Sequence, residues 1–435
     1  MLNSLTNRFI QTAPPDLLAR MVPKASPAYF RKRQLAAFRF IVRYAARHSP
    51  FYRRRFEALG IDARKVNAPE DLGDFYTLPE DIVEYAEEFL CKKPEIVFES
   101  SGTTGRNKRI YLTQDELDII GHNGAIGLYG LGLDKNDRLV NAFDFNIWIP
   151  GMVTQKVIEH SGIFGMPAGK VDPMEIYKRI PIYKFNVIFG EPTWLIRLTE
   201  IAEQKGAYPL KMLVGSAEAL PERARAWMEK VWMGAKVRMM YGTVESAGAM
   251  GFEYRDCCQA YHLNDNNFLA EIYQSDADGY GEFVFTALDR YTMPLIRYRN
   301  RDITRFIPEP CSCGLPMRRI ARIRGRADEL VVASGGNLYP LMFEEILRDV
   351  DGVTSDWQII FKLDGIKEVM TFKLEMAGGD KEAIQKKIYR NTQERYPDLW
   401  KNYTLGIFGI EFLYHEKGAL RKGRKLVRVV DERKF

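Results

Sequence analysis

The chain has 435 residues, which at roughly 150 residues per domain predicts two or three structural units and excludes a single small module. Hydrophobic residues make up 46% and charged residues 28%, so the disordered and fibrous classes are excluded. The net charge of +6 is too small to indicate a nucleic-acid binder, although it suits an anionic, phosphate-bearing small molecule.

The N-terminal residues and the cysteines bear on the compartment. Met1–Ser26 contains prolines and charges and lacks the apolar run of a secretory signal. No stretch approaches the ~18 apolar residues of a membrane span. The five cysteines are too few and too unevenly placed for a disulfide scaffold in a chain of this length. We therefore expect reduced thiols, a cytoplasmic location and no membrane partner.

The elements expected in chain order begin with one amphipathic helix over Tyr29–Leu59, where basic and apolar residues alternate at helical spacing and Gly60 supplies a stop. A strand over Glu95–Glu99 then enters a loop of small residues. Further strands are expected at Arg138–Ala142, Val187–Phe189, Lys211–Val214, Gly281–Phe285 and Leu330–Ala333, with helices at Thr193–Lys205 and Pro221–Val231. This alternation predicts parallel α/β structure, followed by a small α+β unit from about Glu329.

The loop after the first of these strands is the most informative segment. It runs Ser101-Gly102-Thr103-Thr104-Gly105 and is followed by the basic residues Arg106 and Lys108. The glycines permit close backbone approach, so that amide and hydroxyl groups can bind phosphate oxygens. A Walker loop is excluded because the Gly-Lys-Ser/Thr ending is absent. A solvated turn remains the alternative.

Three further segments follow this loop in order: Tyr241-Gly242-Thr243-Val244-Glu245, Pro294–Asp302, and Gly325-Arg326-Ala327-Asp328-Glu329. With them the chain resembles the adenylate-forming (acyl-CoA synthetase) superfamily, in its phenylacetate–coenzyme A ligase-like branch, over nearly its whole length. The resemblance implies an α/β fold with a large N-terminal adenylation domain of parallel and mixed sheets, residues 1–327. It also implies a small mobile α+β C-terminal domain, residues 328–435, with a hinge at Asp328.

The resemblance implies a role for each matching residue. Glu245 would ligate Mg²⁺, Asp302 would bind the ribose hydroxyls, and Arg326 would lie near the nucleotide. The remaining implied ATP contacts are Ser101, Gly102, Thr103, Thr104 (with a catalytic role), Gly105, Ser216, Ala217, Glu218, Tyr241, Gly242 and Thr243. Such a site is chemically sensible, because a carboxylate attacking a phosphate needs a metal and fixed donors to offset the repulsion.

The C-terminal run Lys422–Asp431 resembles the superfamily's terminal motif, which implies that Lys425 is the catalytic lysine. A flexible point charge can stabilise both the pentavalent phosphorus and the attacking carboxylate. The alternative is a solvated basic tail, because Lys422, Arg424 and Arg428 lie close by in the sequence.

Three departures from the superfamily pattern bear on activity. Val244 stands where threonine precedes the motif glutamate, so one hydroxyl donor is displaced to Thr243. Asn107 replaces a common proline, and Arg424 replaces a glycine before the lysine. Loss of one phosphate donor would cost about 2–4 kcal/mol of transition-state stabilisation.

A cluster of soft ligands suits structural Zn²⁺, a metal that the branch often carries. The expected ligands are His262, Cys311 and Cys313 with Cys258, or Cys257 in its place. Four protein ligands close a tetrahedral site, so the metal would be structural. Unrelated buried thiols are the alternative.

Two further segments bear on the acyl acceptor and on the acid substrate. Gly335-Gly336 lies where relatives bring the thiol arm past the backbone, which implies coenzyme A as the acceptor. The segment Phe143–Trp148 falls where the resemblance places part of the acid pocket, and its aromatic residues would wall an apolar or aryl acid. An aromatic core is the alternative for this segment.

The expected activity is that of an acid–thiol ligase (AMP-forming), with ATP, Mg²⁺ and coenzyme A as the expected cofactors. Such an enzyme makes an acyl-adenylate, releases pyrophosphate and passes the acyl group to a thiol. The alternatives are transfer to an amine, a carrier protein or water, and a zinc-containing nucleotide-binding homologue without catalysis. The expected partners are a small carboxylic acid, ATP and coenzyme A, with no nucleic acid; a homodimer is the candidate oligomeric state.

Overall fold

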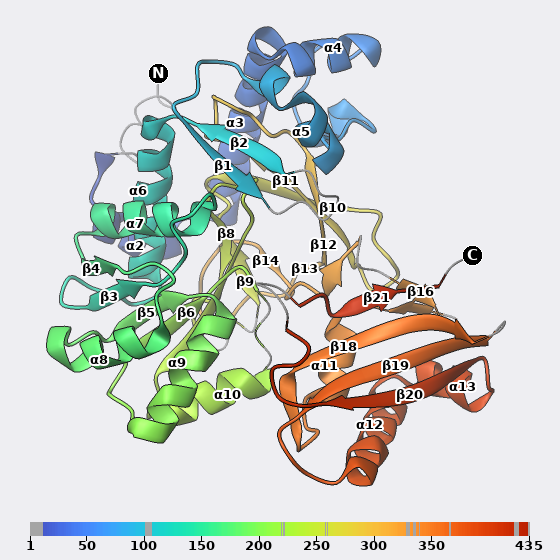
Figure 1. The fold of residues 1–435 in the computed structure, drawn as a ribbon. Helices are drawn as coiled ribbons and strands as arrows, with labels where there is room; N and C mark the ends of the chain where they lie inside the picture. The colour runs from blue at the N-terminus through green and yellow to red at the C-terminus, as the bar shows by residue number, and fades with distance from the viewer. Residues whose placement is uncertain are drawn as a thin grey trace. The chain divides into compact units, whose positions relative to one another are not determined.

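The computed structural model describes residues 12–433 except 101–106, 219, 221, 257, 259, 328–330, 334–335, 339, 365–366 and 422–425, and leaves out the side chains of 332, 333, 336, 337, 367 and 398. The chain divides into two compact units (Figure 1). Unit 1 comprises residues 1–220, 227–300 and 304–322, and unit 2 comprises 221–226, 301–303 and 323–435. The boundary expected at Asp328 falls outside the described residues and stays a prediction.

The N-terminal part of unit 1 is helical. Its helices are α2 (Pro15–Met21), η1 (Val22–Lys24), α3 (Pro27–His48), α4 (Pro50–Ala58), η2 (Pro69–Leu72), α5 (Pro79–Tyr85) and η3 (Ala86–Phe89). The single helix expected over Tyr29–Leu59 is wrong, because α3 ends before Ser49 and α4 begins at Pro50. Ser49 is extended (φ −92°, ψ 123°), as a residue before proline must be, and its hydroxyl caps α4 by accepting from Tyr52 N.

A nine-stranded sheet of the described chain runs through unit 1 in the order β13-β14-β9-β8-β7-β6-β5-β3-β4. The strands are β3 (Arg138–Asn141), β4 (Phe164–Pro167), β5 (Val187–Gly190), β6 (Met212–Gly215), β7 (Lys236–Gly242), β8 (Ala249–Phe252), β9 (Tyr261–Leu263), β13 (Phe306–Ile307) and β14 (Arg319–Ile320). Pairing is parallel from β4 to β7 and antiparallel from β7 onward. The parallel α/β structure expected from the sequence is therefore confirmed.

Helices connect the parallel strands, as a parallel sheet requires. They are α7 (Ile149–Ser161), α8 (Pro173–Tyr183), α9 (Pro192–Lys205) and α10 (Glu222–Val231), whereas α6 (Gln114–Gly130) precedes β3. Two smaller groups of strands follow: the antiparallel pair β1 (Ile96–Ser100) and β2 (Lys108–Leu112), and the strands β10 (Phe268–Tyr273), β11 (Gly281–Ala287) and β12 (Tyr298–Thr304), of which residues 301–303 of β12 belong to unit 2.

Unit 2 is an α+β structure, and its residues from 323 onward are orange to red in Figure 1. Its sheet has the order β20-β19-β18-β21. The elements are β15 (Gly325–Arg326), β16 (Val331–Ala333), β17 (Gly336–Leu338), α11 (Pro340–Leu347), β18 (Val353–Asp364), β19 (Lys367–Met376), α12 (Lys381–Arg395), α13 (Pro397–Thr404), β20 (Phe408–His415) and β21 (Val429–Asp431). Its own core includes Phe343, Phe361 and Phe372, each at most 1% exposed.

The expected fold class is confirmed, since a larger α/β unit precedes a smaller α+β unit. Among the residues that the structure describes, there is no helix with the length and apolar character needed to cross a membrane.

Candidate active site

The phosphate loop expected from the sequence connects two paired strands of unit 1. Residues 101–106 lie outside the described residues, but their flanks are described, and Ser100 at the end of β1 pairs with Lys108 at the start of β2. Asn107 donates from its side-chain amide to Glu99 Oε2 at 2.7 Å. The strand pair therefore fixes the positions of Ser100 before the loop and of Lys108 after it.

Lys108 meets the predicted magnesium ligand. Its Nζ lies 2.5 Å from Glu245 Oε1, and the two side chains are only 13% and 5% exposed. Burial opposes the charge on Glu245, but the Lys108 ammonium together with hydrogen bonds from the backbone and Thr243 holds the pKa of the carboxyl below its usual value. Glu245 is therefore an ionised carboxylate within unit 1, and it offers the hard oxygen donor that Mg²⁺ prefers.

The turn that carries Glu245 is tightly specified. Thr243 N donates to Ser246 Oγ at 3.0 Å, and Ser246 N donates back to Thr243 Oγ1 at 3.2 Å. A Cβ on Gly242 would lie 2.7 Å from Gly248 O, so the strand end tolerates only glycine at this position. Val244 packs against an apolar cluster that includes Phe98 and Leu117. The valine that departs from the family pattern thus has a packing role.

A fully buried arginine supports the same turn by hydrogen bonding to its backbone. Arg290, 1% exposed, donates through its guanidinium to the carbonyl oxygens of Glu245 and Met293. The next residue, Tyr291, donates its backbone N–H to Glu116 Oε1 at 2.7 Å. Although burial opposes its charge, Glu116 has a lowered pKa because it accepts hydrogen bonds from Thr292 and Thr113. The Glu245 turn therefore rests on a charged, hydrogen-bonded layer.

The predicted adenine-side residues cluster around the ends of β6 and β7. Ser216 Oγ donates to Met240 O at 3.2 Å, which joins the end of β6 to β7. Tyr241 lies on β7, and its hydroxyl accepts from Asn300 Nδ2 at 2.7 Å. Its ring centroid is 5.6 Å from that of Phe283. The aromatic ring is therefore held at a fixed orientation.

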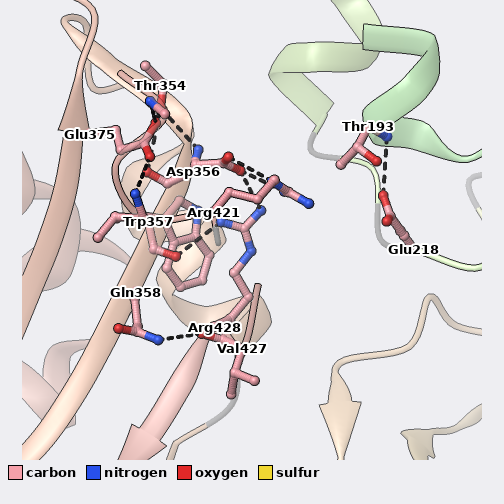
Figure 2. A network of polar contacts seen from close by, with 12 residues as sticks. Thr193, Glu218, Thr354, Asp356, Trp357, Gln358, Glu375, Arg421, Val427 and Arg428 are labelled. Carbon is pink, nitrogen blue, oxygen red and sulfur yellow. Dashed lines mark hydrogen bonds and ion pairs between the residues drawn. The ribbon is translucent and has the colours of Figure 1, made fainter. Parts of the chain in front are cut away.

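Backbone strain also marks these segments. Seven of the described non-glycine residues have positive φ, and four of them lie within or beside the segments singled out from the sequence: Ala217 (74°), Ala247 (57°), Arg297 (47°) and Arg301 (70°). Such conformations cost of order 1–3 kcal/mol each and concentrate at functional sites. Beside Ala217, Glu218 accepts from Thr193 N at 3.2 Å, a contact drawn in Figure 2. That contact ties the β6 loop to the start of α9.

Two predicted nucleotide residues meet in unit 2. Asp302 on β12 pairs in register with Arg326 on β15, and Arg326 Nη1 lies 3.6 Å from Asp302 Oδ1. The Asp302 side chain is 11% exposed and that of Arg326 is 29% exposed. The carboxylate and the guanidinium expected to contact ribose and nucleotide are thus neighbours on paired strands.

The chain on both sides of the expected catalytic lysine is anchored to the unit 2 sheet (Figure 2). Before residues 422–425, Arg421 donates to both carboxylate oxygens of Asp356 at 2.9 and 2.7 Å. After them, Val427 O accepts from Gln358 Nε2 at 2.9 Å, and Arg428 stacks on Trp357 with 4.8 Å between its guanidinium carbon and the ring centroid. Lys425 itself lies outside the described residues, so its catalytic role stays a prediction.

The soft ligands converge in unit 1. Cys258, His262, Cys311 and Cys313 place their ligand atoms within 4.8 Å of one another. His262 lies on β9, and the two later cysteines lie in the loop between β13 and β14. Cys311 Sγ is 3.8 Å from Cys258 Sγ, and Cys313 Sγ is 3.2 Å from His262 Nε2. Cys257, the alternative ligand, lies outside the described residues.

The geometry of this cluster fits a tetrahedral metal. Sulfur ligands at a Zn–S distance of about 2.3 Å lie about 3.8 Å apart along a tetrahedral edge. Burial lowers the pKa of His262 to about 4, so its imidazole is neutral at pH 7, as a ligand must be. Burial raises the pKa of the Cys258 thiol, which disfavours a bare thiolate and makes metal coordination the way to stabilise one.

The segment expected at the acid pocket divides in two. Phe143 is 1% exposed and belongs to the hydrophobic core of unit 1. Phe145 and Ile147 are 37% and 47% exposed, and the Ile147 carbonyl accepts from Glu99 N at 3.0 Å. One aromatic is therefore core, whereas the other lies on a loop that is fastened to β1.

Several predicted residues cannot be placed, and several unpredicted ones emerge. Thr104 and the rest of the phosphate loop lie outside the described residues, as does Gly335, whereas Gly336 begins β17. Lys108 was identified from the sequence as a basic residue, but its ion pair with Glu245 could be recognised only from the fold. Asn300 lies within a quoted motif, whereas Arg290 has no local signal and is identified only by its burial.

Comparison with known families gives two matches in chain order. A model described as AMP-binding enzyme matches residues 94–268, and a model described as AMP-binding enzyme C-terminal domain matches residues 335–433. The first match spans the phosphate loop and the Glu245 turn.

Curated relatives and solved structures agree with these matches. The chain is 27% identical over 353 residues to a phenylacetate–coenzyme A ligase of Thermus thermophilus (78% of this chain and 79% of the relative). It is 25% identical over 360 residues to that of Escherichia coli (79% and 82%). A structure of 2-hydroxyisobutyryl-CoA ligase in complex with 2-HIB-AMP has a similar fold, with a TM-score of 0.79, 19% identity and coverage of 92% and 89%. O-succinylbenzoate coenzyme A synthetase from Bacillus subtilis also has a similar fold (TM-score 0.57, 15% identity, 76% and 68%).

Proposed function

Because this chain belongs to the AMP-binding enzymes, in their phenylacetate–coenzyme A ligase-like branch, we propose that it is an ATP-dependent acid–coenzyme A ligase. In the first half-reaction, the carboxylate of the acid attacks the α-phosphorus of ATP, forming an acyl-adenylate and releasing pyrophosphate. In the second, the thiol of coenzyme A attacks the acyl carbon and AMP leaves. An aryl or phenylacetate-like acid is the proposed substrate class.

The ion pair between Glu245 and Lys108 is the observation that carries this proposal. A buried, ionised carboxylate paired with Lys108, which follows the phosphate loop in the sequence, would suit a magnesium ion that offsets phosphate charge. Lys108 is a flexible point charge, so it can turn from Glu245 towards a phosphate when a metal binds the carboxylate. Thr104 and the other loop residues would donate to the phosphates, and Lys425 would stabilise the charge that develops at phosphorus.

The two nucleotide groups of unit 2 have complementary proposed roles. Asp302 would accept from the ribose hydroxyls, and Arg326, its neighbour at 3.6 Å, would lie near the nucleotide. Tyr241, held by Asn300, would stack near adenine.

The test is pyrophosphate release with ATP and Mg²⁺ across aryl, short-chain and long-chain acids, with and without coenzyme A. We expect acid-dependent release that Lys425→Ala abolishes and that Lys401→Ala, an exposed lysine of α13, leaves unchanged. Stimulation by coenzyme A would support the thiol acceptor, whereas product formation only with an amine or a carrier protein would favour those alternatives. Nucleotide binding without turnover would favour a homologue that has lost catalysis.

The second half-reaction is proposed to follow a rotation of the C-terminal domain, residues 328–435, about Asp328, which would withdraw Lys425 and present Gly335-Gly336 to the thiol arm. Asp328→Pro should then slow thioester formation more than adenylation. Equal slowing of the two half-reactions would contradict the rotation.

A structural Zn²⁺ held by Cys258, His262, Cys311 and Cys313 is proposed as part of the same enzyme. Elemental analysis of purified protein should give one zinc per chain. Cys311→Ser should lower that ratio and the Tm, whereas Cys91→Ser, which changes a thiol outside the cluster, should change neither. Full stability after complete removal of zinc would contradict a structural role. A homodimer and the cytoplasmic location stay predictions.

A further inference from the structure

The outward face of α3 is the strongest feature of the molecule that the proposed reaction does not use. The helix covers Pro27–His48 and contains six arginines and lysines but no aspartate or glutamate. Its core-facing side includes Phe38, Ile41 and Val42, all fully buried. Gln34 fastens it to the β10 region by donating to Asp265 Oδ1 at 3.0 Å. The positive charge of this helix is therefore concentrated on a firmly held scaffold.

Two parallel ridges of side chains line a groove of about 520 Å³ on this face. One ridge is Arg39, Arg43 and Arg47, spaced at i, i+4 and i+8. No ion pair to a described carboxylate involves these three arginines, and the guanidinium of Arg43 is held by donating to Arg64 O at 3.0 Å. The cationic ridge is thus available for an acidic partner.

The second ridge is aromatic and follows Ala36 along the helix. It consists of Phe40, Tyr44 and His48, also spaced four residues apart. Phe40 is 55% exposed and stacks on Tyr44 with 6.1 Å between the ring centroids. Tyr291 buttresses the ridge, since its ring meets Phe40 at 5.8 Å and Tyr44 at 5.6 Å. These contacts hold the apolar ridge in a fixed shape.

The groove has the form in which α-helices pack against one another. Ridges of i±4 side chains on one helix fit into the grooves between such ridges on another. The groove runs from Ala36 to His48, which is about 18 Å or three helical turns. Its lining side chains are exposed or half-buried, so it does not enclose a small molecule as a nucleotide pocket does. A bilayer surface also has no ridge to fill such a groove.

We propose that this groove is the docking site for an α-helix of a partner protein, acidic along the edge that faces Arg39, Arg43 and Arg47 and apolar along the edge that faces Phe40 and Tyr44. Charge complementarity selects the acidic edge and steers association, while burial of the aromatic ridge adds apolar contact. The inference is independent of the ligase reaction, because none of these side chains is assigned a role in it.

The test uses the full chain and designed helical peptides of about 18 residues, long enough to span the groove. Each fluorescein-labelled peptide forms a helix with a row of glutamates along one edge and a row of leucines along the adjacent edge. The peptides of the set differ in how far the leucine row is shifted along the helix relative to the glutamate row, in steps of one residue. Fluorescence anisotropy should give saturable binding that weakens with salt. Arg43→Glu/Arg47→Glu should weaken it at least 10-fold, and Phe40→Ala about 5-fold.

Arg31→Glu/Lys32→Glu is the matched control, because it makes the same charge change at exposed positions of α3 outside the groove. We expect this variant to bind within 3-fold of wild type, and a peptide of scrambled sequence to bind at least 10-fold more weakly. Pyrophosphate release should be the same in both double variants, which separates this proposal from the ligase assignment.

Three results would overturn the proposal. The first is absence of binding by every peptide of the set. The second is equal weakening by the control and groove variants, which would reduce the effect to overall charge. The third is groove-dependent binding to phosphatidylserine-containing vesicles without peptide binding, which would assign the face to a lipid surface.

Discussion

Glu245 in unit 1 and Asp356 in unit 2 are both carboxylates that basic neighbours keep ionised despite burial, yet their partners differ. Glu245 faces Lys108, a compact charge on a flexible stem. Asp356 faces Arg421, whose planar fork binds both of its oxygens. A lysine can leave a carboxylate for another anion, whereas a bidentate arginine forms a fixed tie. The first pair therefore suits exchange of ligands during a reaction, and the second suits anchoring of a strand.

Of the changes that test this comparison, removal of the Glu245 charge has the largest expected effect. Glu245→Gln should reduce pyrophosphate release by about 10²–10³-fold, because the proposed metal ligand and its electrostatic stabilisation are lost. Circular dichroism would check that the fold is retained. Glu87→Gln is the control, since Glu87 pairs with Arg109 at 3.0 Å but is 61% exposed, and it should leave the rate unchanged. Near-normal activity of Glu245→Gln would contradict a role of the Glu245–Lys108 pair in the reaction.

Asp289, the residue before Arg290, provides a pH test of this part of unit 1. Burial raises its pKa from 3.8 to about 6, even though Asn267 donates to it at 2.5 Å. The folded state therefore holds a proton that the unfolded state has released, so stability should fall as pH rises from about 4 to about 6. The difference corresponds to about 3 kcal/mol. Thermal unfolding of wild type and Asp289→Asn between pH 4 and 7 would measure it, and parallel pH profiles would contradict the prediction.

Arg290 should act as a positioning residue for Glu245. Arg290→Met removes the donor to the Glu245 carbonyl and should lower kcat by about 10–100-fold, as loss of a group that orients a metal ligand does. The Mg²⁺ concentration for half-maximal rate should rise as well, a change that global destabilisation alone would not produce. Arg290→Lys should recover part of the rate, and the exposed Arg305→Met serves as the control. An unchanged Mg²⁺ dependence in Arg290→Met would show that the turn positions Glu245 without Arg290.

The smallest expected effect concerns Asp356. Asp356→Asn should lower the free energy of unfolding by about 1.5 kcal/mol, because the charge-assisted hydrogen bonds to Arg421 are weakened. Its pKa is below the usual value, so this stabilisation is present at neutral pH and is lost as pH falls through the lowered pKa. Urea unfolding followed by tryptophan fluorescence would measure the change. Asp351→Asn, whose carboxylate is 98% exposed, should have no effect.

Much of the fold was predictable because its signals are local. The apolar strands β5 and β6 and the helix α9 lie within one residue of the ranges expected from periodicity and turn residues. The expected helix over Tyr29–Leu59 was wrong because periodicity continues across Ser49-Pro50, while the backbone restriction before proline does not allow the helix to continue.

For the candidate site, the sequence by itself predicted which segments would carry the chemistry, through the order of the phosphate loop, the Tyr241–Glu245 turn and the Asp302 strand. Only the tertiary structure decided that Lys108 pairs with Glu245 and that Arg290 supports that turn. The four soft ligands were expected from the sequence, and the structure shows that their ligand atoms meet. The physical reason is that ion pairing, burial and metal-ligand geometry join residues tens to more than a hundred positions apart. Periodicity and turn chemistry, by contrast, act over a few residues along the chain and can be read without the fold.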